Sequence, residues 1–152
     1  MKQSAFYTLL LIVLSLTVLT ACDNDDHDHE HEHEDAFGVA LFIGSNQVAI
    51  QEGGVISYAD GSHLSLSVGE TTETMSVRFI AEDGDLFTPE DDDFFLEIEN
   101  NNTSVATTSI SSGSPYNFTI TGVSEGEAQL QFELIHVNHA DFTSLPFIVV
   151  VE

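Results

Sequence analysis

The chain has 152 residues, with 26 Asp and Glu, only 2 Lys and Arg, and a formal net charge of -24. This balance excludes nucleic acid as a partner, because phosphates are bound by Lys and Arg that displace counterions. It also disfavours docking on an anionic membrane surface, whereas cations and cationic partners are attracted. The length allows one domain with a substantial hydrophobic core.

Residues 1–21 predict an export signal. Lys2 gives a short basic start, and an uncharged apolar run follows over residues 5–21. Such a run, closed by a small residue, is typical of a cleaved signal peptide. An uncleaved anchor helix with an incidental cysteine is the alternative.

The end of this run, Leu19-Thr20-Ala21-Cys22, resembles the lipobox of bacterial lipoproteins. In that family cleavage falls before the cysteine, and the thiol receives a diacylglycerol. The resemblance implies that Cys22 is lipidated and tethers the protein in the bacterial cell envelope, on the periplasmic face or the cell surface. Cys22 is the single cysteine of the chain, so no internal disulfide can stabilise the domain that follows.

Residues 22–36 predict a disordered tether rich in His, Asp and Glu. Residues 22–35 read CDNDDHDHEHEHED and offer no apolar surface to offset chain entropy. Its imidazoles alternate with carboxylates, and both are metal ligands. The histidines of this tract are His27, His29, His31 and His33.

The tract is expected to bind divalent metal with modest affinity and rapid exchange, because the chain must bend around the ion and lose entropy. Binding is expected to weaken as the pH falls through about 6 to 7, because protonated imidazole is no ligand. A solvated spacer that holds the domain off the membrane is the alternative.

Residues 37–152 predict one all-β domain of about eight strands. Short β-rich runs are separated by Gly, Asn, Asp and Ser, and no window has a helical period. This organisation predicts a single antiparallel β-sandwich. The runs are residues 39–43, 47–50, 55–58, 63–68, 75–80, 94–98, 117–121, 128–134 and 147–151.

The second half of this domain, roughly residues 65–152, resembles the bacterial immunoglobulin-like domains of surface proteins. The resemblance lies in residues 103–106, in residues 120–130 and in the last Val-rich strand. Gly122 and Gly126 are expected to allow a tight corner before the penultimate strand. An immunoglobulin-like sandwich is implied; such domains serve as spacers, adhesins and carriers of binding loops, and the fold does not decide among these.

A candidate metal site lies in residues 134–142. His136 and His139 converge if the strand ends near His136 and the chain turns at residues 137–138, where Asn138 tolerates the left-handed conformation. Asp141 lies on the side of His139, two residues on. His63 is a candidate fourth ligand or supporting partner. A polar loop whose imidazoles bond to backbone carbonyls is the alternative.

Other chemistry finds less support in the sequence. Residues 82–85 and 90–93 are acidic, but the ligand spacing of an EF-hand loop is absent, so calcium is not expected there. The sequence motifs of nucleophilic, zinc-protease and phosphate-binding sites are also absent, and no enzymatic activity is expected.

Together these features predict an envelope lipoprotein that binds a divalent transition metal, first zinc and otherwise copper or nickel. The tether would capture ions near the His136 loop, and the protein would hand them to an envelope transporter. The competing hypothesis is a non-enzymatic accessory or adhesive immunoglobulin-like module, with the tract as a spacer. A saline habitat is a third account of the acidity alone.

Overall fold

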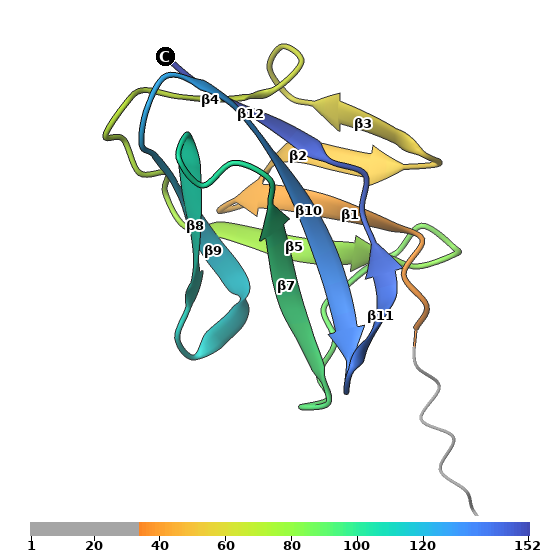
Figure 1. Ribbon diagram of the computed structural model, residues 1–152. Coiled ribbons are helices and arrows are strands. Elements are labelled where there is room, and N and C mark those ends of the chain that lie inside the picture. The colour runs from red at the N-terminus through yellow and green to blue at the C-terminus, as the bar shows by residue number, and fades with distance from the viewer. Residues whose placement is uncertain (1–33) are drawn as a thin grey trace, which may run out of the picture. The chain divides into compact units, whose positions relative to one another are not determined.

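The computed structural model describes residues 34–152, which form two packed β-sheets (Figure 1). The predicted signal peptide, Cys22 and the four histidines of the tract lie outside the described residues. Within the described part, no helix is long and apolar enough to cross a membrane. The strands are β1 (Gly38–Ile43), β2 (Asn46–Glu52), β3 (Val55–Tyr58), β4 (Leu64–Leu66), β5 (Met75–Ile80), β6 (Leu86–Phe87), β7 (Phe94–Asn100), β8 (Ala106–Ser111), β9 (Ser114–Gly122), β10 (Gly126–His136), β11 (His139–Thr143) and β12 (Phe147–Val151).

The seven-stranded sheet has the order β3-β2-β1-β5-β9-β8, with β6 added beside β5. The five-stranded sheet is built on the long strand β10, which pairs with β7, β11 and β12. The all-β architecture predicted from the sequence is therefore confirmed at the level of two packed sheets. One detail of the prediction is corrected: β4 and β12 run parallel, so the sandwich is not wholly antiparallel.

The core lies between the sheets and is rich in phenylalanine. Alternation along the strands sends every second side chain inward, so β9 and β10 bury one face each. Phe118 of β9 meets Phe132 of β10 with ring centroids 5.3 Å apart, and Phe132 meets Phe147 of β12 at the same distance. The first of these contacts joins the two sheets, and the second joins neighbouring strands of one sheet, so aromatic packing holds the core together.

The last hairpin is fastened to the rest of the sandwich by side chains that cross between the sheets. Phe142 of β11 packs edge-on against Phe79 of β5, with centroids 5.9 Å apart. The buried amide oxygen of Gln51 in β2 accepts a hydrogen bond of 2.6 Å from the backbone N–H of Leu145, which follows β11. These contacts pack β11 against the other sheet and so help to position the residues at its start.

Gly122 and Gly126 frame the corner between β9 and β10, as the sequence predicts. A Cβ on Gly122 would lie 2.6 Å from the carbonyl oxygen of Ser67, so the close approach of the two backbones requires glycine. Gly126 has a φ of 145°, which L side chains rarely adopt.

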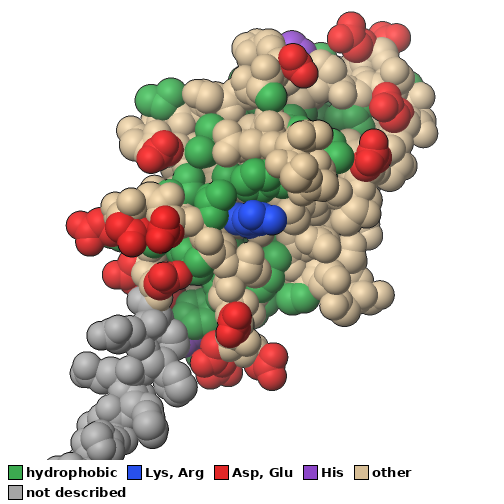
Figure 2. All heavy atoms as spheres, turned by 180° about the vertical axis from the view of Figure 1, so that it is seen from behind, with side chains coloured by type: hydrophobic (Ala, Val, Ile, Leu, Met, Phe, Trp, Pro, Cys, Tyr) green, Lys and Arg blue, Asp and Glu red, His purple; other side chains and the backbone are tan. Residues whose placement is uncertain are grey.

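Charge is distributed unevenly over the surface. Arg78 is the only Lys or Arg in the described part of the chain, and its guanidinium lies over the Phe42 ring, 4.8 Å from the centroid. In Figure 2 this single basic side chain is surrounded by apolar and neutral groups, while the acids lie towards the periphery of that face.

Candidate metal centre

The β10–β11 hairpin brings His136, His139 and Asp141 together. His136 is the last residue of β10 and is paired directly with His139, the first residue of β11, across a two-residue turn. Directly opposed residues of an antiparallel pair have neighbouring side chains. The sequence-based prediction that the strand ends at His136 and that the two rings converge is thus confirmed.

The turn is strained, and the strained residue is not the expected one. Val137 has a φ of 56°, whereas Asn138 does not have a positive φ. A β-branched residue in this region is a genuine outlier and costs about 1 to 3 kcal/mol. Two backbone contacts hold it: the N–H of Val137 donates to the carbonyl of Asp93 at 2.9 Å, and that of Asn138 to the carbonyl of His136 at 2.6 Å. Strain of this kind gathers at functional sites, which makes the hairpin tip a candidate for one.

Asp141 owes its position to a β-bulge. In the register of the hairpin, Ile135 pairs with Ala140 and Leu134 with Phe142, so Asp141 is the residue that the pairing skips. A bulge turns a side chain away from the regular alternation of the strand. The sequence places Asp141 on the side of His139 from a spacing of two, but it contains no signal for the bulge that sets its direction.

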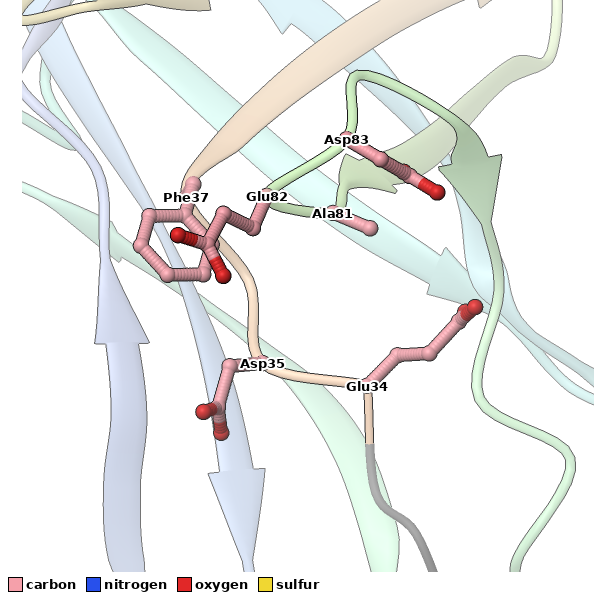
Figure 3. Close-up of a pocket in the computed structure, with 6 residues that line it drawn as sticks. All are labelled: Glu34, Asp35, Phe37, Ala81, Glu82 and Asp83. Atoms are coloured by element: carbon pink, nitrogen blue, oxygen red, sulfur yellow. The ribbon is translucent and has the colours of Figure 1, made fainter.

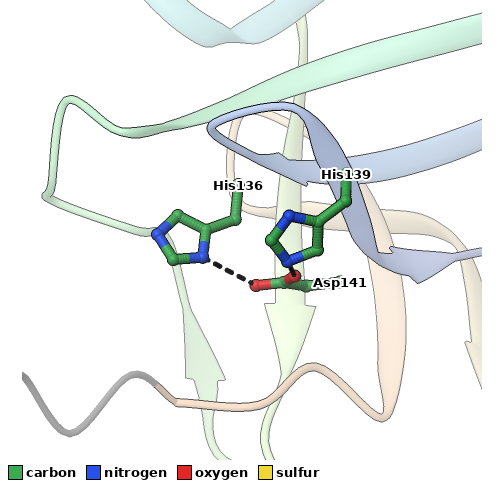
Figure 4. Close-up of side chains that lie close together, drawn as sticks. All are labelled: His136, His139 and Asp141. Carbon is green, nitrogen blue, oxygen red and sulfur yellow. Dashed lines mark ion pairs between the residues drawn. The ribbon is translucent and has the colours of Figure 1, made fainter.

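The carboxylate of Asp141 lies between the two imidazoles (Figure 4). Its Oδ2 is 3.4 Å from Nδ1 of His136, and its Oδ1 is 2.8 Å from Nε2 of His139. The side chains of His136 and Asp141 are 25% and 30% exposed, and that of His139 is 62% exposed. The group therefore has one side that rests on the domain and one side open to solvent.

The ring of His136 is held in place by Phe94 of β7. The two rings are stacked, with centroids 4.3 Å apart and an interplanar angle of 10°. Phe94 is buried and is paired with His136 in the ladder between β7 and β10. His136 is thus flanked by Phe94 on one strand and His139 on the other, with the two histidine centroids 5.5 Å apart. This packing pre-orients one ligand before any ion binds.

The spacing of the donor atoms suits a transition metal. One ligand atom from each of the three residues lies within 4.8 Å of the other two. A tetrahedral zinc ion with bonds of about 2.0 to 2.1 Å holds its ligand atoms about 3.3 Å apart. The separations of 2.8 and 3.4 Å run to different oxygens of Asp141, Oδ1 and Oδ2. The three side chains must therefore draw somewhat closer together to coordinate one ion with one atom each.

His63, expected as a fourth or supporting ligand, is not brought to this group. It lies just before β4, where its Nδ1 is 3.3 Å from the hydroxyl of Ser62. It also lines a hollow with Ile43 and Met75. Ile43 and Met75 pair with each other at one end of β1 and β5. Phe79, which packs against Phe142 of β11, lies near the other end, so His63 and the His136 hairpin are at opposite ends of these strands.

The acidic loops form no comparable group within residues 34–152. Glu34, Asp35, Glu82 and Asp83 line a shallow hollow beside Phe37, and their carboxylates point in different directions (Figure 3). Acids in both loops instead shape the backbone: Asp83 accepts a hydrogen bond from the N–H of Asp85 at 3.0 Å, and Asp91 accepts one from Asp93 at 3.1 Å. These are the local turns that Asp commonly builds.

No family model and no curated protein matches this chain. Among solved structures, it is similar to the crystal structure of domains 4 and 5 of the S-layer protein SbsC, with 20% sequence identity and a TM-score of 0.44. The match covers 75% of this chain and 65% of that one, so it spans less than two thirds of the solved chain.

Proposed function

We propose that this protein binds a divalent transition metal ion through His136, His139 and Asp141, with zinc as the first candidate and copper or nickel as alternatives. The observation that carries the proposal is the convergence of these three donors from one hairpin at near-coordinating distances. Two imidazole nitrogens select transition metals over calcium and magnesium, which prefer oxygen ligands only.

The form of the group favours reversible capture over a structural role. Three protein ligands leave a fourth position for water or an incoming ligand, as exchangeable zinc sites do. His139 is the most exposed of the three and can release the ion to solvent. The domain also has a continuous apolar core of its own, so its folding does not require the ion.

The cellular setting belongs to the same proposal and rests on the sequence. A lipobox-like Cys22 places the domain in the bacterial cell envelope, and the tract with His27, His29, His31 and His33 supplies further imidazoles. A strongly acidic surface raises the local concentration of cations near both groups. We infer a non-enzymatic protein with an immunoglobulin-like sandwich that captures metal and hands it to an envelope transporter.

The test is a zinc titration of a whole-chain variant whose four tract histidines are replaced by serines. The signals of the imidazole nitrogens are monitored by NMR during the titration. His136 and His139 should show coordination shifts at one equivalent of zinc, whereas His63, at the other end of the domain, serves as the internal control. Equal shifts of all three rings, or none, would remove the proposed site. The protein would then be better described as a tethered interaction module.

A further inference from the structure

A second site lies at the end of the sandwich away from the His136 hairpin. A hollow of about 260 Å³ opens there beside the loop that joins β3 to β4. Its floor is made of the buried side chains of Leu66, Met75 and Ile120, which come from β4, β5 and β9. Three strands of both sheets thus lie beneath the hollow, and its accessible apolar surface comes from the half-buried side chains of Ile43, Val48 and Leu64.

The walls and the size of the hollow suit a small apolar body. Ile43 and Val48 flank the floor, and both are only half-buried, so they have apolar surface left to cover. A dry cavity of about 150 Å³ with such a lining is enough to hold benzene. Leu64 of β4 is also half-buried and adds apolar surface to the same wall.

The rim of the hollow determines the charge of its occupant. Asp60 and His63 lie at the rim with Ser65 and Thr72, and no Lys or Arg lines this hollow. Arg78, the only cation of the described residues, lies over Phe42 and is not part of the lining. A carboxylate or phosphate would meet Asp60 without a compensating cation, whereas an ammonium group would be attracted by it and by the acidic surface as a whole.

We propose that this hollow binds a small primary ammonium compound, with its apolar body on Ile43, Val48 and Leu64 and its ammonium group at Asp60. This site is independent of the metal group and goes beyond the function proposed above. It also gives His63 a role as a rim residue in place of the ligand role expected from the sequence.

The experiment is an NMR titration of the metal-free protein with n-hexylammonium, and with hexanoate and 1-hexanol as probes of equal chain length. Saturable shifts should be confined to the amides of the lining, with n-hexylammonium bound at least about threefold more tightly than hexanoate, as an exposed charge pair allows. Tighter or equal binding of hexanoate would overturn the assignment of charge. Absence of saturable binding by n-hexylammonium would overturn the site.

Two variants separate the apolar and the ionic contributions. Ala59 is exposed at the rim, so Ala59→Trp should fill the opening and abolish binding of both n-hexylammonium and 1-hexanol without disturbing the core. Asp60→Asn should weaken n-hexylammonium by about threefold and leave 1-hexanol unchanged. Asp85→Asn, at an exposed acid outside the lining, is the matched control. An equal loss in this control would show that general surface charge, and not the hollow, attracts the probe.

Discussion

The hydroxyl groups of Tyr116 and Tyr58 differ in whether they have a hydrogen-bond partner. Removing the hydroxyl oxygen should therefore raise the free energy of unfolding at one position and lower it at the other. The Tyr116 hydroxyl is buried between the sheets and has no hydrogen-bond partner among the described residues. The Tyr58 hydroxyl accepts a hydrogen bond of 2.7 Å from the backbone N–H of Ile148, which ties β3 to β12 across the two sheets. Phenylalanine keeps the ring at either position.

The expected change in the free energy of unfolding follows from the cost of burying a polar group that has no hydrogen-bond partner. Tyr116→Phe removes a desolvated polar group and should raise the free energy of unfolding by about 1 kcal/mol. Tyr58→Phe leaves the N–H of Ile148 without its acceptor and should lower it by about 1 to 2 kcal/mol. Denaturant unfolding at pH 7 measures both, and the two variants should differ by about 2 to 3 kcal/mol. A Tyr116→Phe variant as destabilised as Tyr58→Phe would refute this reasoning.

The same pair predicts how the protein behaves in alkali. Burial raises the pKa of Tyr116 to about 12, from an ordinary value of 10.0. Burial also raises the pKa of Tyr58, with the hydrogen bond from Ile148 acting in the opposite direction. Below pH 10 both folded and unfolded states keep the Tyr116 proton, so the group adds no pH dependence there. Above pH 10 the unfolded state loses the Tyr116 proton before the folded state does. The free energy of unfolding should therefore fall by roughly 2 to 3 kcal/mol by pH 12. Tyr116→Phe should therefore unfold at a higher pH.

Three further changes address the metal group. Asp141→Asn keeps the shape of the side chain but removes its charge, and should weaken zinc binding by about tenfold or more in calorimetry; unchanged affinity would exclude Asp141 as a ligand. Phe94→Leu keeps apolar bulk but removes the stacked ring beside His136, and should lower zinc affinity by about threefold, with Phe94→Tyr restoring it; equal affinities in both variants would show that the stack does not position the ligand. Val137→Gly relieves the positive φ at the hairpin tip and should raise the free energy of unfolding by about 1 kcal/mol in denaturant; a loss of stability would show that the Val137 conformation is not strained.

Strands were predictable where burial on one face imposes alternation or, as in β1, where burial on both faces gives a continuous apolar run. Each predicted run lies on an observed strand, although residues 63–68 shorten to Leu64–Leu66. Three strands were missed because their sequences lack that pattern: β6 has two residues, β8 reads ATTSIS and β11 reads HADFT. Each is defined by pairing with a neighbour, which is a property of the tertiary structure. The parallel pairing of β4 with β12 is of the same kind.

The candidate site was predictable only in its local part. The alternation up to His136 and the turn-forming Asn138 place a turn there, and the turn brings the two histidines together. Nothing local indicates that Phe94, more than forty positions earlier in the chain, stacks on His136. For His63 the residue type alone was misleading: histidine is a common metal ligand, but the fold places this one away from His136, His139 and Asp141.

The most direct test of the proposed function is calorimetric zinc titration of four forms of the whole chain near neutral pH. These are the native sequence, His136→Ala/His139→Ala, a form with serine at His27, His29, His31 and His33, and the combination of both changes. The native chain should show two classes of binding, one lost with each set of substitutions, and the combined variant should bind no zinc tighter than about millimolar. Zinc binding by the tract-substituted form that persists without His136 and His139, or the absence of any binding class that depends on them, would contradict the account.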